Sequence, residues 1–151
     1  MSDQTEVLKK AKLRATENNL TYSGALTPEE AHTLMQENPG TLLVDVRSLA
    51  ELELVGRVPG ALHIEWAFYP GMVANPDFDK QLLEQVNKQA PVIFMCRTGG
   101  RSHNAAVVAA KLGYTAFNML EGFEGDANSQ QQRTLINGWK HAGLPWTHAK
   151  K

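Results

Sequence analysis

The stretch Val92-Ile93-Phe94-Met95-Cys96-Arg97-Thr98-Gly99-Gly100-Arg101-Ser102 contains the strongest structural signals in the chain. Val92 to Met95 is an uninterrupted apolar run, typical of a strand that is buried on both faces of a sheet. Gly99 and Gly100 allow positive φ angles and close backbone approach, so a tight loop is predicted after the strand. Residues 102–112 are predicted to form a helix, whose small alanine side chains would let it pack closely on the sheet.

The alternation of strands and helices continues on both sides of this unit. Thr27-Pro28-Glu29-Glu30 is typical of a helix start, with a capping residue, a proline in the first turn and acidic residues near the positive end of the helix dipole. Further strands are predicted at residues 42–46, 61–64 and 115–120, and further helices at residues 27–37, 49–54, 77–88 and 131–142. This order predicts an α/β fold in which helices cover both faces of a parallel sheet.

Length and composition fit a single globular domain. The chain has 151 residues, of which 42% are hydrophobic and 21% charged, so it can build one sizeable core and is unlike a disordered segment. Residues 7–18 look helical, but their apolar pattern is weak. We therefore predict an N-terminal helical extension at residues 1–20, followed by one domain at residues 21–148.

Charge and hydropathy argue against two classes of partner. A formal net charge of -1 provides no global basic field for nucleic acid or for an anionic membrane surface. The longest apolar stretches fall well short of the ~20 residues that span a bilayer. The first residues lack the basic and apolar regions of a secretory signal, and one cysteine cannot form an internal disulfide. We expect a cytoplasmic protein with no nucleic-acid or membrane partner.

Cys96 is the only cysteine, and it follows directly after the predicted strand. Ligands of open parallel sheets bind beyond the carboxyl ends of the strands. The glycine loop can point successive N–H groups inward to hold an anion, and the following helix adds the positive end of its dipole. Arg97 and Arg101 can add charge and directional donors. Most lone cysteines are core residues, but these surroundings favour the thiolate and predict a nucleophile in an anion-binding cup.

No metal or cofactor is expected. The five histidines have no spacing typical of metal ligands, and no second cysteine or cluster of carboxylates accompanies them. They are His32, His63, His103, His141 and His148. His103 is expected to face solvent from the first turn of its helix. The loop around Cys96 is thus the predicted reactive centre.

Four motifs, in order, resemble those of the rhodanese family over roughly residues 26–146. Cys96 to Ser102 resembles the family's loop Cys-x-x-Gly-x-Arg-Ser, and Asp45-Val46-Arg47 with Glu51 resembles its Asp-Val-Arg-x-x-x-Glu segment. Residues 56–61 resemble Gly-His-Ile-Pro-Gly-Ala, and residues 120–123 resemble a turn of the type Leu-Glu-Gly-Gly. The resemblance implies a rhodanese-like three-layer fold, with a central parallel sheet of about five strands flanked by helices.

The resemblance also implies a sulfurtransferase that carries sulfur as a persulfide on Cys96. The donor would be a small anion such as thiosulfate, or a persulfide, and the acceptor would be cyanide or a thiol, including a protein cysteine. Cys96 is the implied catalytic residue, and the implied supporting residues are Asp45, Arg47 and Glu51, with Arg47 expected to pair with Glu51. The persulfide would be held by the loop residues Arg97, Thr98, Gly99, Gly100, Arg101 and Ser102.

The chain departs from the family pattern in three places. Arg57 stands where the family has a histidine, Phe123 stands where it has a glycine, and residues 124–133 add length that would place a polar loop near the site. Residues 66–72 are a second candidate for a pocket wall, although aromatic side chains of this kind are more often core.

Two other functions stay open. Cysteine-based phosphatases and related arsenate reductases use a similar cup with five residues between the cysteine and the arginine, whereas here only Arg97 to Gly100 intervene. That shorter spacing favours a single sulfur over a tetrahedral phosphate. The third alternative is a non-catalytic interaction module of rhodanese fold, because function resides in sites rather than in folds.

Overall fold

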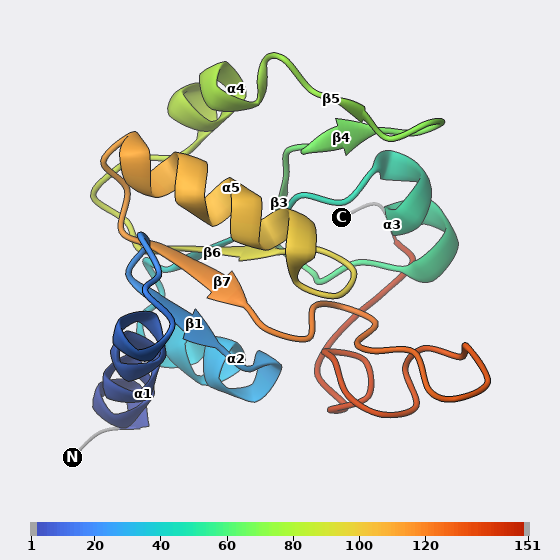
Figure 1. Ribbon diagram of the computed structural model, residues 1–151, viewed down its shortest axis with the longest axis horizontal. Coiled ribbons are helices and arrows are strands. Elements are labelled where there is room, and N and C mark those ends of the chain that lie inside the picture. Colours follow the sequence, from blue (N-terminus) through green and yellow to red (C-terminus); the bar gives the residue numbers. More distant parts are fainter. Residues whose placement is uncertain (1–2, 150–151) are drawn as a thin grey trace.

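The computed structural model describes residues 3–149 and is built around one parallel sheet (Figure 1). Five strands lie in the order β1-β7-β6-β2-β3, and every neighbouring pair in this sheet is parallel. Their bounds are β1 Gly24–Leu26, β2 Leu42–Asp45, β3 Leu62–His63, β6 Val92–Met95 and β7 Ala116–Met119. The two remaining strands, β4 (Ala67–Phe68) and β5 (Val73–Ala74), form a separate antiparallel hairpin.

Helices cover both faces of the sheet, which makes three layers (Figure 1). On one face lie α4 (Phe78–Gln85) and α5 (Gly100–Lys111), and on the other lie α1 (Asp3–Glu17) and α2 (Pro28–Glu37). The short helix α3 (Leu49–Val55) follows β2 at the carboxyl end of the sheet. No helix within residues 3–149 is long and apolar enough to span a membrane. The predicted fold class is confirmed.

Alternating residues of the central strands supply the two halves of the core. Val92 and Phe94 of β6 face α4 and α5, whereas Ile93 and Met95 face α1 and α2. All four side chains are fully buried. A strand with apolar residues on both faces is what a covered parallel sheet requires, so the continuous run of residues 92–95 has its physical explanation here.

Local signals fix where several helices begin. Thr27 accepts a hydrogen bond from the backbone N–H of Glu30, whose side chain in turn accepts one from the N–H of Thr27, so α2 starts with a complete capping box. Ser48 and Glu51 form the same arrangement at the start of α3. The observed helices and strands shared with the prediction differ from it by at most four residues at either end.

The helix predicted at residues 131–142 is wrong. Gln131, Thr134 and Gly138 all have positive φ angles, which an α-helix cannot contain. The segment instead folds back on the turn after β7, where Thr134 N–H donates to Glu124 O and Trp139 N–H donates to Gly122 O. Trp139 is fully buried, so its position is set by the core and not by helical periodicity.

The N-terminal helix packs closely on the edge strand β1. A Cβ atom on Gly24 would lie 2.7–2.8 Å from atoms of Ala11, so α1 and β1 approach as near as backbone allows. Arg14 of α1 forms an ion pair with Glu30 of α2 and donates to Ala25 O of β1. Neither β1 nor the β4–β5 hairpin was predicted, because segments of two or three residues leave no periodic pattern.

Candidate active site

Cys96 lies between β6 and the first residue of α5, with its side chain turned into the core. It is 1% exposed. The backbone N–H of Gly99 donates to Cys96 Sγ over 3.1 Å, and Ser102 Oγ lies 3.4 Å from the same sulfur. Gly99 reaches this position with a φ of +115°, a value that side-chain-bearing residues rarely adopt. The glycine loop therefore curls over the sulfur and offers it a backbone donor.

The turn after β7 supports this loop from behind. Phe123 N–H donates to Cys96 O over 2.8 Å, and the N–H groups of Glu124 and Gly125 donate to Arg97 O over 3.1 and 3.2 Å. Gly122, with a φ of +66°, lies so close that a Cβ there would be 2.6 Å from the carbonyl oxygens of Cys96 and Arg97. Backbone contacts with this turn thus hold the loop in place.

Arg101 is held by Glu51 of α3 in a two-armed ion pair. Its Nη1 and Nη2 donate to Glu51 Oε1 and Oε2 over 2.7 and 2.8 Å. These bonds raise the pKa of Arg101 against burial, and attraction to the sulfur of Cys96 adds to the rise. Burial alone would raise the pKa of Glu51, but hydrogen bonds from Arg101 and Ser48 lower it to about 2. Both groups are therefore charged at neutral pH.

The predicted pairing of Arg47 with Glu51 is wrong. Arg47 pairs with Asp45, and its Nε and Nη2 donate to the two carboxylate oxygens over 2.9 and 2.6 Å. It also donates to Gly56 O and lies 4.2 Å above the ring of Phe123. The side chains of Arg47 and Asp45 are 0% and 1% exposed, so this pair is buried at the carboxyl end of β2. Glu51 instead faces the Cys96 loop from the first turn of α3.

Asn118 of β7 connects Ser102 to the loop. Its amide Nδ2 lies 3.3 Å from Gly99 O, and since a carbonyl can only accept, this contact orients Oδ1 towards Ser102. Ser102 Oγ donates to that oxygen over 2.6 Å, so its single proton points away from Cys96 Sγ. A polar asparagine inside the apolar run of residues 115–120 is the signal that sequence reasoning missed.

The same network reaches the surface of α5. Tyr22 hydroxyl and His103 Nδ1 are 2.7 Å apart, and Asn118 also hydrogen-bonds Tyr22. Burial raises the pKa of Tyr22, and the bond from Asn118 partly offsets that rise. His103 was expected to face solvent, but it is partly buried because Tyr22, in the loop before β1, covers it.

A cleft of about 470 Å³ lies beside the loop and is lined by both charged and apolar side chains. Its charged residues are Arg97, Arg101, Glu51 and Glu124, and Arg97 forms an ion pair with Glu124 over 3.3 Å. Tyr69 and Met72 contribute an apolar wall. Part of the second candidate wall predicted at residues 66–72 therefore lies at this cleft, whereas Trp66 packs against Phe78 in the core.

The structure thus divides the predicted site residues into three groups. Gly99 and Ser102 surround the sulfur of Cys96. The remaining loop residues stand at its rim, where Gly100 is exposed, Thr98 is partly buried, and Arg97 and Arg101 face the cleft together with Glu51 of α3. Asp45 and Arg47 form the separate buried pair at the carboxyl end of β2, and neither lines the cleft.

Comparisons with known proteins identify the family of the chain. The family model described as "Rhodanese-like domain" matches residues 27–129. The crystal structure of Rv0390 from M. tuberculosis has a TM-score of 0.79 and 36% identity, over 85% of this chain and 99% of that chain. The uncharacterized protein RC0915 of Rickettsia conorii is 34% identical over 120 residues, which are 78% of this chain and 91% of the relative.

Some of the similar proteins have a named activity. The thiosulfate sulfurtransferase GlpE of Actinobacillus pleuropneumoniae is 28% identical over 121 residues, which are 80% of this chain and 89% of that protein. The family model covers more than half of the chain, and the five-stranded sheet with helices on both faces matches the fold that the motifs implied. The chain belongs to the rhodanese family.

Proposed function

We propose that the protein is a sulfurtransferase that moves sulfane sulfur from thiosulfate or a persulfide donor to a thiophilic acceptor, through a persulfide on Cys96. The observation that carries this proposal is the backbone N–H of Gly99, 3.1 Å from Sγ at the N-terminus of α5. A backbone donor at a helix start stabilises negative charge on sulfur. Arg101 stands beside the same loop, and attraction to the sulfur of Cys96 contributes to its raised pKa.

The proposed reaction has two steps. The Cys96 thiolate attacks the outer sulfur of thiosulfate, a sulfur–sulfur bond forms, and the bond of that sulfur to the sulfonate group breaks with sulfite as the leaving group. In the second step an acceptor attacks the terminal sulfur of the persulfide and restores the thiolate. Cyanide gives thiocyanate, and a thiolate gives a new persulfide. No general base is required, because every leaving group departs as an anion.

The acceptor must come from outside the chain. The sequence has one cysteine, so no second thiol of the same chain can take up the sulfur. We propose a small thiol or a protein cysteine as the cellular acceptor and cyanide as the acceptor in vitro. A free reactive thiol fits a reducing compartment, which supports the cytoplasm as the location.

Phosphate ester hydrolysis is disfavoured by the partner of Arg101. In the active-site loop of a cysteine-based phosphatase, the guanidinium of the arginine after the loop donates two hydrogen bonds to the phosphate. Here both Nη1 and Nη2 of Arg101 already donate hydrogen bonds to Glu51, and only four residues separate Cys96 from Arg101. A single sulfur needs one or two backbone donors and little room, which this loop can provide.

Mass spectrometry tests the proposal directly. After incubation with thiosulfate, the intact protein should gain the mass of one sulfur atom, and cyanide should remove that sulfur as thiocyanate. The variant Cys96→Ser should show neither effect, and since it contains no cysteine it can form no persulfide elsewhere. Undiminished thiocyanate release by this variant would falsify the assignment. Parallel assays with glutathione persulfide would rank the donors.

A further inference from the structure

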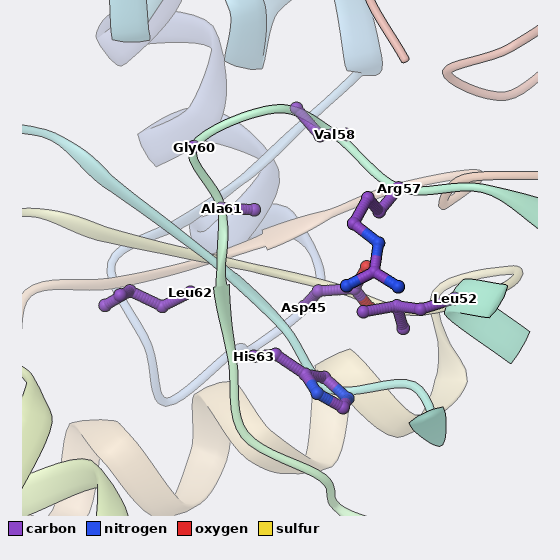
Figure 2. Close-up of a pocket in the computed structure, with 8 residues that line it drawn as sticks. All are labelled: Asp45, Leu52, Arg57, Val58, Gly60, Ala61, Leu62 and His63. Carbon is purple, nitrogen blue, oxygen red and sulfur yellow. The ribbon is translucent and has the colours of Figure 1, made fainter. Parts of the chain in front are cut away.

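A second pocket, of about 350 Å³, lies beside β3 at the edge of the sheet (Figure 2). Its volume falls within the range of roughly 300–1,000 Å³ that is usual for small-molecule sites. It shares no lining residue with the cleft at the Cys96 loop. The pocket is therefore a separate feature that the sulfur chemistry leaves unexplained.

Arg57 is the principal polar group of this pocket. Its guanidinium points into the pocket, towards Leu52 and Asp45 (Figure 2). Within residues 3–149 its side chain has neither an ion pair nor a hydrogen bond, and its Nε is a buried donor without a partner. Buried donors are nearly always paired in folded proteins, so an unpaired one that faces a cavity indicates a ligand acceptor.

The neighbouring carboxylate does not neutralise Arg57. Asp45 also lines the pocket, but its two oxygens already accept hydrogen bonds from Nε and Nη2 of Arg47. His63 is held in place by a contact of 2.7 Å between its Nε2 and Arg47 O. The positive charge of Arg57 is therefore available to an anion. Asp45 limits the charge of that anion, because a dianion would face a carboxylate at close range.

The remaining walls are apolar. Leu52 and Ala61 point towards the guanidinium in Figure 2, and Val58 lines the same space. We propose that this pocket binds a small organic monocarboxylate, with the carboxylate on the guanidinium of Arg57 and a short apolar body against Leu52 and Ala61. The planar fork of arginine matches a carboxylate with two parallel hydrogen bonds. This binding is independent of the proposed sulfur transfer.

Nuclear magnetic resonance on the full chain tests the proposal. Sodium butyrate is titrated against sodium chloride at constant ionic strength, and two signals are followed: the side-chain Nε–H of Arg57 and the backbone amide of Ala61. We expect a saturable shift of both signals with butyrate. Phosphate and thiosulfate at the same concentration should give at most a weak shift, because Asp45 opposes a second negative charge.

Three variants assign the binding to this pocket. Arg57→Leu should abolish the saturable shift at Ala61, and its backbone should stay in place because Arg57 N–H and O both pair with Thr147. Lys111→Leu, which removes an exposed positive charge on α5, should bind butyrate like the parent chain. Ala61→Leu keeps Arg57 but fills the space, and should weaken binding at least tenfold.

Three results would overturn the proposal. The first is a shift that rises linearly with butyrate and never saturates. The second is equal binding by Arg57→Leu and the parent chain. The third is tighter binding of phosphate or thiosulfate than of butyrate, which would exclude the monocarboxylate as the ligand class.

Discussion

Two arginine–carboxylate pairs take their carboxylates from one short segment, residues 45–51, and they stand in very different surroundings. Asp45–Arg47 is fully buried at the carboxyl end of β2, whereas Glu51–Arg101 lies at the cleft with each side chain 21% exposed. The first pair joins neighbours in the sequence and fixes the end of a strand. The second joins residues fifty positions apart and fixes the helix that follows Cys96. We infer that the buried pair governs stability and the cleft pair governs the reactive loop.

The largest effect is expected from breaking the buried pair. Arg47→Met leaves the carboxylate of Asp45 buried without its partner, which should cost about 3–5 kcal/mol in the free energy of unfolding. Urea denaturation measures this loss. The double variant Asp45→Leu with Arg47→Met should recover most of it, because the uncompensated charge is gone. A double variant no more stable than the single one would contradict this account.

Breaking the cleft pair should affect turnover more than stability. Glu51→Gln removes the charge that holds Arg101 beside the loop, and we expect the rate of persulfide formation to fall about tenfold, equivalent to ~1.4 kcal/mol. The free energy of unfolding should fall by only about 1 kcal/mol. The matched control is Glu53→Gln, an exposed residue of the same helix. Equal rates for the two variants would show that the loop does not depend on this pair.

A smaller effect is expected at Asn118, the other polar support of the loop. Asn118→Leu removes the acceptor of the Ser102 hydroxyl and the donor to Gly99 O, which should cost about 1 kcal/mol of stability and lower the turnover a few-fold. Asn104→Leu, on the exposed face of α5, is the control. Unchanged turnover together with reduced stability would limit Asn118 to a purely structural role.

The smallest expected effect is that of acid on the stabilisation that the Glu51–Arg101 pair gives to the folded protein. The pKa of Glu51 is about 2 in the folded protein and 4.5 as its ordinary value, so the unfolded chain binds the proton more readily. The stabilisation is therefore complete above about pH 4.5 and is lost as the pH falls towards 2. We expect the stability difference between the parent chain and Glu51→Gln to shrink over that range, as measured by urea denaturation at successive pH values. A constant difference would contradict it.

The sequence predicted the parts of the site that are local. Some features depend only on residues within a few positions in the sequence. These are the strand at residues 92–95, the glycine loop after Cys96 and the capped start of α2. The pairing of Arg101 with Glu51 could not be predicted, because it depends on how α3 and α5 meet at the end of the sheet. The roles of the loop residues and the domain boundary at residues 20–21 stay predictions.

The error at residues 131–142 has a similar origin. A helix was predicted there, but Trp139 is placed by its burial and by the hydrogen bond from its Nε1 to Pro145 O. Gly138 approaches Gly125 so closely that a Cβ would lie 2.7 Å from the backbone nitrogen of Gly125. Long-range contacts of this kind override local preference, and a single sequence does not display them.

The order of synthesis decides when Gly122 and Phe123 can support the Cys96 loop. The ribosome makes Cys96 before it makes either residue, so the nascent chain carries its thiol before the backbone contacts that shape the loop can exist. A chain that stops before Gly122 would keep the nucleophile and lose the support behind it. The reactive centre is therefore completed from its C-terminal side, late in the growth of the chain.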